Sequence, residues 1–214
     1  MGDVAMMIPS LRCLIKKYPE TKITIVSKPT FRPFFIEFKN LDFFEVNFKT
    51  KHKGLKGVFK LFKELSKLNP THIADLHSVL RTHLLFFLFK LKVYKIKRIN
   101  KSIAERKKLF RKNNKIFKPL TPGQYRYSEV FNRLGFNIDL SNHEFSDPLQ
   151  INSQDQIAHI DKSKKWIGIA PFASFNGKIY PLDLMQNIVS FLQRDHQVFL
   201  FGNGNYEIDR KSVV

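Results

Sequence analysis

The chain of 214 residues contains little cysteine and few acidic residues. Its single cysteine, Cys13, excludes a disulfide framework and a zinc site built from several cysteines. Asp and Glu number 18 against 37 Lys and Arg, which leaves a formal net charge of +19. The most apolar run, 84–89, is far shorter than the roughly 20 residues that a helix needs to cross a bilayer. We therefore expect a cytoplasmic protein that is stabilised by a hydrophobic core.

Several motifs for metal and phosphate chemistry are also absent. The sequence contains neither the GxxxxGK[ST] phosphate loop nor the HExxH zinc motif, and its seven histidines form no metal-ligand set. It contains no Asp-x-Asp, so a divalent ion held by paired carboxylates is not supported. We expect no metal and no cofactor, and any bound phosphate would be held by backbone amides, hydroxyls and lysines.

The positive charge is concentrated in one part of the chain. Residues 49–118 contain 21 Lys and Arg but three Asp and Glu, whereas residues 1–48 carry +2 and residues 119–214 carry −1. A basic segment of this kind suits nucleic acid, an anionic membrane surface or a phosphorylated acceptor. Lysine far outnumbers arginine in it, so a general compositional bias towards lysine is a further explanation.

Short strand patterns alternate with helical patterns along the chain. Strands are predicted at 23–27, 43–48, 72–77, 93–99, 166–170 and 197–201, and helices at 4–18, 55–68, 79–91, 127–134 and 182–192. A basic helix or loop is expected between the strand at 93–99 and about Lys118. This alternation predicts an α/β fold with parallel sheets. The aromatic residues fall on the apolar faces of the predicted helices, which argues against stacking platforms for nucleic-acid bases.

The region 136–165 is polar and has no long periodic run, so it is the best candidate for a domain boundary. We predict an N-terminal domain at 1–140, a linker at 141–165 and the start of a second domain at 166–214. No strand precedes the first helix, and two strands with one helix are too few for a stable parallel-sheet domain. We therefore expect the chain to be part of a longer protein.

Asp3 lies at the start of the first predicted helix. An Asp at this place commonly caps the helix by accepting hydrogen bonds from its free N–H groups. It could equally serve as a general base, because sites in doubly wound sheets gather where a strand passes into a helix.

Two loops in the C-terminal part are candidates for binding a phosphate or a nucleotide. After the strand at 166–170, the loop contains the small residue Ala173, the hydroxyl of Ser174 and the charge of Lys178, and it leads into a helix. An ordinary surface loop explains this spacing equally well. After the strand at 197–201, Gly202 begins a Gly-x-Gly turn in which Glu207 replaces the third glycine of a dinucleotide fingerprint.

Three stretches together resemble glycosyltransferase family 9, the ADP-heptose:lipopolysaccharide heptosyltransferases. The stretches are GDVAMMIPSLRCLIKKYPETKITIVS (2–27), DLHSVLRT (75–82), and IGIAPFASFNGKIYPLDLM (167–185) followed by VFLFGNGNYE (198–207). The family opens with a strand and then a Gly-Asp helix followed by Tyr-Pro. It later carries an Asp-Leu-His/Gln-x-x-x-Arg-Ser/Thr segment and a Lys-x-Trp-Pro motif. Here Tyr180 stands in the place of that Trp.

The resemblance implies the GT-B architecture, which has two Rossmann-like domains with parallel sheets, the second truncated here. It implies a metal-independent, inverting transfer of a heptose or related sugar from a nucleotide sugar, ADP-heptose, to a lipid-anchored lipopolysaccharide core. It further implies that Asp3 is the general base and that Gly2 and Arg81 contact the acceptor. The donor would contact Ala173, Ser174, Lys178, Gly202 and Glu207.

The resemblance also gives the basic segment a partner, the anionic cytoplasmic face of the inner membrane, and predicts no nucleic-acid partner. Two alternatives stay open at the level of sequence. One is a basic nucleic-acid-binding α/β protein. The positive charge supports it, but the sequence contains no known nucleic-acid-binding motif. The other is a nucleotide-binding oxidoreductase, against which the absent third glycine argues.

Overall fold

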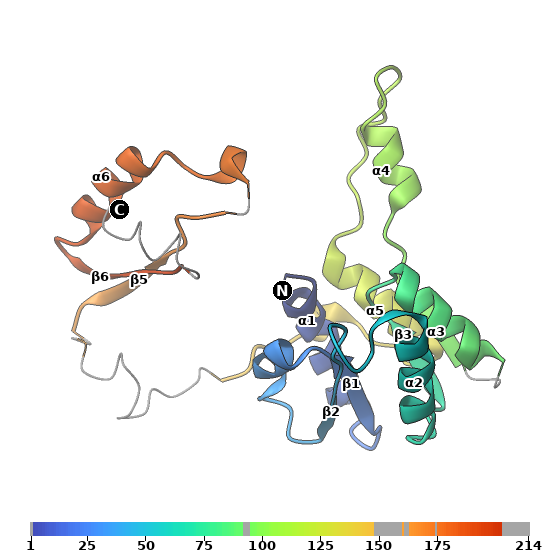
Figure 1. The fold of residues 1–214 in the computed structure, drawn as a ribbon. Coiled ribbons are helices and arrows are strands. Elements are labelled where there is room, and N and C mark those ends of the chain that lie inside the picture. Colours follow the sequence, from blue (N-terminus) through green and yellow to red (C-terminus); the bar gives the residue numbers. More distant parts are fainter. Residues whose placement is uncertain (1, 92–94, 148–159, 161–162, 174, 203–214) are drawn as a thin grey trace. The chain divides into compact units, whose positions relative to one another are not determined.

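A computed structural model describes residues 2–91, 95–147, 160, 163–173 and 175–202 (Figure 1). The chain divides into two compact units, Met1–Asp147 and Pro148–Val214, and each is described by itself. The boundary between them falls inside the segment 141–165 that the sequence predicts as a linker. The functional assignment of the two domains stays a prediction.

The first unit alternates helices and strands along the chain. Its elements are α1 (Gly2–Lys17), β1 (Ile23–Ser27), η1 (Pro29–Phe35), β2 (Leu41–Glu45), α2 (Gly54–Ser66), β3 (His72–Asp75), α3 (Leu80–Lys90), β4 (Lys95–Arg98), α4 (Ile103–Leu109), α5 (Gly123–Leu134) and η2 (Leu140–Asn142). η1 and η2 are 3₁₀ helices that the sequence patterns did not predict.

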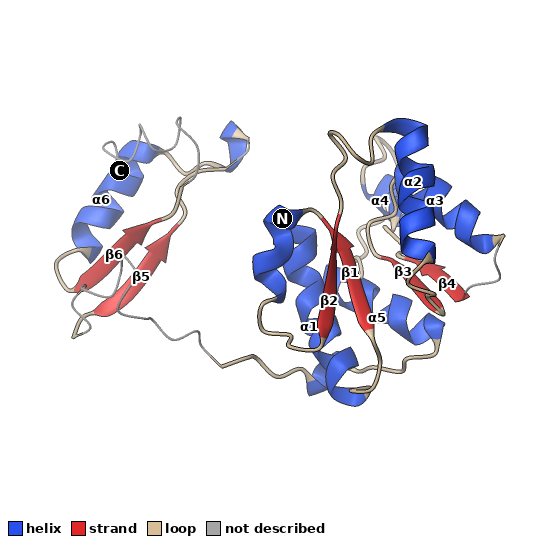
Figure 2. Cartoon of the chain, turned by 60° about the horizontal axis from the view of Figure 1, so that its bottom comes forward, coloured by secondary structure: helices blue, strands red, loops and turns tan. Residues whose placement is uncertain are grey.

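The strands of the first unit form two parallel pairs (Figure 2). β1 pairs with β2, with Ile23 opposite Leu41, and β3 pairs with β4, with His72 opposite Lys95. The parallel pairing confirms the predicted α/β class. Within the described residues the two pairs are not hydrogen-bonded to each other.

Helices cover both faces of these strands. Phe43 packs into a core with α1 and α5, whereas the next residue, Phe44, packs into a second core with α2 and α3. In the same way, Ala74 packs against the first core and Ile73 against the second. Because successive side chains of a strand point to opposite faces, α1 and α5 lie on one side of the strands and α2 and α3 on the other.

The apolar spacing of α1 and α5 determines which faces they bury. Leu11 and Leu14 of α1, and Val130 and Leu134 of α5, are buried in the shared core. α5 ends at Gly135, whose φ of +103° is a left-handed conformation that favours glycine, and whose N–H bonds to carbonyls of the last turn. The sequence predicted this stop.

The second unit contains a third parallel pair. β5 (Lys165–Ile169) pairs with β6 (His196–Leu200), and the ladder continues where the Phe201 N–H donates to the Ile169 carbonyl at 2.7 Å. Between them lie the 3₁₀ turn η3 (Asn176–Lys178) and helix α6 (Leu182–Leu192). Strand, helix and parallel strand are arranged as a βαβ unit.

Two sequence predictions need correction. The second strand runs over Leu41–Glu45 and not over 43–48, because pairing with β1 places Leu41 and Asp42 opposite Ile23 and Thr24. Phe110 and Phe117 do not lie on a packed apolar face, since their side chains are 82% and 83% exposed. The predicted strand at 93–99 begins within 92–94, which lies outside the described residues.

None of the helices in the described part of the chain is both long enough and apolar enough to span a membrane.

Candidate functional site

Asp3 lies in the first turn of α1 and is exposed to solvent. Helix α1 begins at Gly2, so Asp3 is inside the helix and not at the capping position that one interpretation of the sequence assigned to it. Asp3 therefore has the solvent access that a general base requires.

The N-terminal part of α1 is held against the first turn of α5. The Ser10 hydroxyl, which is completely buried, donates a hydrogen bond to the Gln124 carbonyl at 3.0 Å. Gly123 allows the close approach of Met6, because a Cβ at position 123 would lie 3.2 Å from the Met6 sulfur. The start of α5 is thus part of the surroundings of Asp3.

Tyr127 and Arg126 of α5 bring further polar groups to this region. Burial raises the pKa of the Tyr127 hydroxyl, the negative charge of Asp3 raises it further, and Arg126 acts in the opposite direction. Arg126 is half-buried, and its Nε has no hydrogen-bond partner in the part of the chain that the structure describes. Sequence reasoning missed Arg126, because the start of α5 comes close to α1 only through the packing of the two helices.

Asp75 occupies the C-terminal end of β3 and shapes the turn that follows. Its Oδ1 accepts hydrogen bonds from the backbone N–H groups of His77, at 3.2 Å, and Ser78, at 2.8 Å. Ser78 has a φ of +46°, in the left-handed region that non-glycine residues seldom adopt. The Asp-Leu-His segment of the sequence is thus a tight turn organised by a buried carboxylate.

Arg98, at the end of β4, faces the other oxygen of Asp75. Its Nε lies 3.7 Å from Asp75 Oδ2, which makes an ion pair without a hydrogen bond. The guanidinium also stacks on the ring of Phe86, 4.4 Å from its centre. Asp75 is therefore held by two amides and a cation, and its role is structural.

Arg81 stands in the first turn of α3, a few residues beyond the Asp75 turn. Its guanidinium carbon lies 3.9 Å from the centre of the Phe48 ring, so a cation–π contact fixes the side chain. The residue is exposed, and it forms no ion pair with any carboxylate among the described residues. Its charge is available to an anionic ligand.

These groups share one edge of the first unit. Near the far ends of α1 and α5, Tyr18 contacts Phe136, and the Phe136 ring contacts His72 at the start of β3. The two helices therefore run antiparallel to β3, and their N-terminal ends lie towards the C-terminal ends of the strands. In open α/β sheets ligands bind at this edge. The fold thus places Gly2, Asp3 and Arg81 at the same edge.

The second unit presents an equivalent edge. Ala173 and Lys178 lie in the loop after β5, and Gly202 follows β6, so all three are at the C-terminal end of the parallel pair. Lys178 ends the 3₁₀ turn η3, is exposed, and has its Nζ 5.6 Å from the centre of the Phe175 ring. Ser174 and Glu207 lie outside the described residues.

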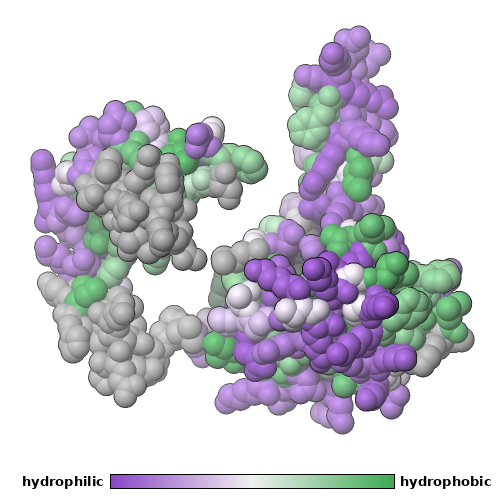
Figure 3. Space-filling model, in the orientation of Figure 1, coloured by the Kyte–Doolittle hydropathy of each residue, from purple (hydrophilic) through white to green (hydrophobic). Residues whose placement is uncertain are grey.

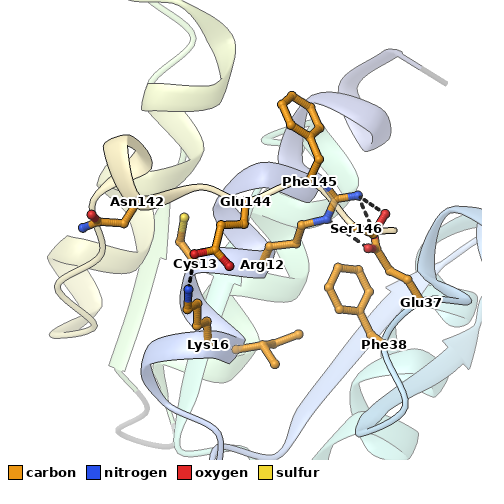
Figure 4. Close-up of a pocket in the computed structure, with 10 residues that line it drawn as sticks. Arg12, Cys13, Lys16, Glu37, Phe38, Asn142, Glu144, Phe145 and Ser146 are labelled. Carbon is orange, nitrogen blue, oxygen red and sulfur yellow. Dashed lines mark hydrogen bonds and ion pairs between the residues drawn. The ribbon is translucent and has the colours of Figure 1, made fainter. Parts of the chain in front are cut away.

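A separate cavity of about 290 Å³ lies beside the C-terminal half of α1 (Figure 4). Arg12 donates two hydrogen bonds to Glu37, at 2.9 and 3.0 Å, and another to the Ser146 hydroxyl, while Lys16 pairs with Glu144. Because these charges neutralise each other, no described residue that lines the cavity offers a free cation to a phosphate. We interpret its polar groups as the attachment of residues 143–146 to α1.

Cys13 lines this cavity and has no disulfide partner. Burial raises the pKa of its thiol, and the charge of Asp139 raises it further. The thiol is therefore protonated at neutral pH and is a poor nucleophile. Cys13 is a small residue of the core that α1 and α5 share.

Among the described residues, no group of three or more His, Cys, Asp and Glu side chains is arranged to hold a metal ion. The chemistry available at the two edges comes from carboxylates, from the cations Arg81, Arg126 and Lys178, and from backbone N–H groups.

Comparisons with known proteins bear on the fold. No family model and no curated protein sequence matches the chain. The fold is similar to a crystal structure from Veillonella parvula DSM 2008 described as glycosyl transferase family 9, with a TM-score of 0.70 and 20% sequence identity. The similarity covers 100% of this chain and 63% of that one.

At this level of identity the similarity establishes the shared α/β fold. It concerns the same family that the three sequence stretches resemble, and it covers both units. The chain spans 63% of the length of the Veillonella protein.

Proposed function

We propose that this chain belongs to a family 9 glycosyltransferase of the GT-B type. It would move a heptose or related sugar from a nucleotide sugar, ADP-heptose, to the core of a lipopolysaccharide. The observation that carries the proposal is the structural similarity to a family 9 protein over the whole chain. Residues 1–140 would form the acceptor-binding domain, 141–165 the linker, and 166–214 would belong to the donor-binding domain.

Asp3 is the general base of the proposed reaction. Its carboxylate removes the proton from an acceptor hydroxyl, and the oxygen attacks the anomeric carbon of the donor from the face opposite the diphosphate. The bond from that carbon to the diphosphate oxygen breaks, and the nucleoside diphosphate leaves with the electron pair. One displacement inverts the configuration at the sugar carbon. The exposed position of Asp3 in the first turn of α1 supports this role.

The acceptor is held, in this proposal, by Gly2, Arg81 and Arg126. Arg81 carries a charge that no carboxylate among the described residues neutralises, and Arg126 is a half-buried residue of α5 whose charge, like that of Asp3, acts on Tyr127. Both suit the phosphate groups of a phosphorylated core oligosaccharide, since guanidinium groups bind phosphate with paired hydrogen bonds. The backbone at Gly2 lets the acceptor approach without meeting a side chain.

The donor is held by the loops of the second unit. Lys178 and the Ser174 hydroxyl bind the diphosphate and stabilise the charge that develops on it, together with the N-terminus of α6. Ala173 and Gly202 let the nucleotide approach the backbone closely, and Glu207 accepts hydrogen bonds from the ribose. The position of Ala173, Lys178 and Gly202 at one edge of the β5–β6 pair supports this assignment.

The test is an assay for release of nucleoside diphosphate with the longest natural form of the polypeptide. ADP-heptose and a panel of other sugar nucleotides are each supplied with and without a lipid A-core acceptor. We expect release from ADP-heptose that depends on the acceptor. Absence of turnover with every sugar nucleotide, with the protein folded by circular dichroism, would contradict the proposal.

A further inference from the structure

A basic arm projects from the first unit. We define the arm as residues 101–118, which comprise α4 and the loop that returns from it (Figure 1). No side chain of α4 is buried, and residues 110–119 are all exposed. The Ile116 N–H donates to the Lys108 carbonyl at 3.3 Å, so the returning loop runs beside the helix. The arm contributes almost nothing to the cores of the unit.

The arm has a high and uncompensated positive charge. It contains eight Lys and Arg and one acidic residue, Glu105, which gives +7. None of these eight cations forms an ion pair with a carboxylate among the described residues. Charges that are exposed on a projecting element and lack internal partners are available to an external anionic surface.

Large apolar side chains are interleaved with these charges. Phe110 and Phe117 are 82% and 83% exposed, and Ile103 and Ile116 are 60% and 49% exposed. Figure 3 shows apolar groups among the hydrophilic ones along the arm. Leaving four such residues in water on an element without a core has no structural benefit, because an apolar side chain stabilises a fold only when it is removed from water.

We propose that the arm binds the surface of an anionic lipid bilayer. Its lysines and arginines lie among the headgroups, while Phe110, Phe117 and the two isoleucines enter the boundary with the acyl chains. The isoleucines favour lipid over nucleic acid, because an aliphatic side chain has no aromatic face on which a base can stack. This inference does not depend on glycosyl transfer, so the two proposals can fail separately.

The first experiment compares two sets of charge substitutions by sedimentation with vesicles of phosphatidylcholine and phosphatidylglycerol. The arm variant is Lys107→Gln, Lys108→Gln and Lys112→Gln. The control is Lys56→Gln, Lys60→Gln and Lys63→Gln on exposed positions of α2, which removes the same charge from a packed helix. We expect the arm variant to bind at least about 50-fold more weakly and the control to change less than about fivefold.

The second experiment tests insertion of the aromatic residues. Phe110→Ser combined with Phe117→Ser should weaken vesicle binding about tenfold or more, whereas Phe59→Ser on α2, where Phe59 is 48% exposed, should leave it unchanged. In addition, Phe110→Trp should give tryptophan fluorescence that lipids brominated in the acyl chains quench. The parent, with Trp166 as its one tryptophan, is the control. This variant gives a new signal and does not rely on a loss.

Three results would overturn the proposal. One is an equal loss of vesicle binding in the arm and α2 charge variants, which would indicate general attraction by a lysine-rich chain. Another is the absence of quenching at position 110 in vesicle-bound protein. The third is tighter binding to a single-stranded RNA oligonucleotide than to vesicles at equal salt, with no effect of the serine substitutions.

Discussion

Two carboxylates at the same edge of the first unit, Asp3 and Asp75, have opposite surroundings. Asp75 is buried, accepts hydrogen bonds from two backbone amides, and faces Arg98 at 3.7 Å. Asp3 is exposed in the first turn of α1, and its side chain makes no hydrogen bond or ion pair within the described residues. The carboxylate of Asp3 on α1 is thus free, whereas the carboxylate of Asp75 at the end of β3 holds a turn.

The difference indicates which of the two carboxylates can take part in a reaction and which one stabilises the fold. Asp75 is buried and its Oδ1 already accepts two backbone hydrogen bonds, so it is placed to hold the turn and not to meet a substrate hydroxyl. Asp3 is exposed, and its side chain makes no hydrogen bond or ion pair within the described residues, so a substrate hydroxyl can reach it. Substitution of Asp3 should therefore change turnover, and substitution of Asp75 should change stability.

The largest expected effect comes from Asp3→Asn. We expect turnover of the sugar nucleotide to fall about 10²–10⁴-fold, since the proton acceptor is lost, with donor affinity and melting temperature nearly unchanged. Turnover kinetics and thermal unfolding on the same preparation check both parts. The matched control is Glu20→Gln, another exposed carboxylate, which should keep full activity. Retained activity of Asp3→Asn would remove the contrast between the two carboxylates.

Asp75→Ala should have the largest effect on stability. The substitution leaves the N–H groups of His77 and Ser78 without their acceptor and Arg98 without its carboxylate, so we expect about 2–3 kcal/mol lower free energy of unfolding. Urea unfolding measures it. An unchanged midpoint would show that the buried carboxylate does not hold the turn.

Arg126→Gln tests whether the region around Asp3 binds the acceptor. Loss of a charge-assisted hydrogen bond to an acceptor phosphate should raise the KM for the acceptor about tenfold and leave the KM for the donor unchanged. Arg126→Lys should restore part of the affinity. Equal effects on both substrates would argue against a place for Arg126 at the acceptor.

Glu64 extends the comparison to a second engaged carboxylate. Burial raises its pKa, but hydrogen bonds from Lys51 and from His52, which is completely buried, outweigh burial and hold the pKa below its ordinary value. The resulting stabilisation is fully present above the pKa of the unfolded chain, about 4.3, and is lost as the pH falls through the lower folded pKa.

Glu64→Gln should therefore lower the free energy of unfolding by about 1 kcal/mol at pH 7. The gap between parent and variant should close as the pH falls below about 4. Urea unfolding at several pH values measures it, and Glu105→Gln, on the exposed helix α4, is the control. A gap that is constant with pH would mean that the charge of Glu64 does not stabilise the fold.

The periodic parts of the fold could be predicted from sequence. The β-branched run at Ile23–Ser27 gave β1 with its observed bounds, and the spacing of Tyr127, Val130, Phe131 and Leu134 gave α5 with its stop at Gly135. β2 was placed two residues too late, because Asp42 interrupts the apolar pattern and pairing with β1 decides where the strand begins.

The tertiary parts of the site could not be predicted in this way. Asp3 and Arg81 could be named from their motifs, but Arg126 becomes relevant through the packing of α5 on α1, two helices far apart in the sequence. The exposure of Phe110 and Phe117 was missed for a similar reason. A local pattern shows that a segment is apolar and basic, and it does not show whether another element covers it.

The proposed base and reaction can be tested most directly by the mass of the acceptor. A lipid A-core acceptor is incubated with ADP-heptose and either the parent protein or the Asp3→Asn variant, and the masses of the products are measured by mass spectrometry. We predict that the parent adds one heptose to the acceptor and that Asp3→Asn, which still binds the donor, adds none in the same time. Equal addition by both proteins would contradict the role of Asp3, and addition by neither would contradict the proposed reaction.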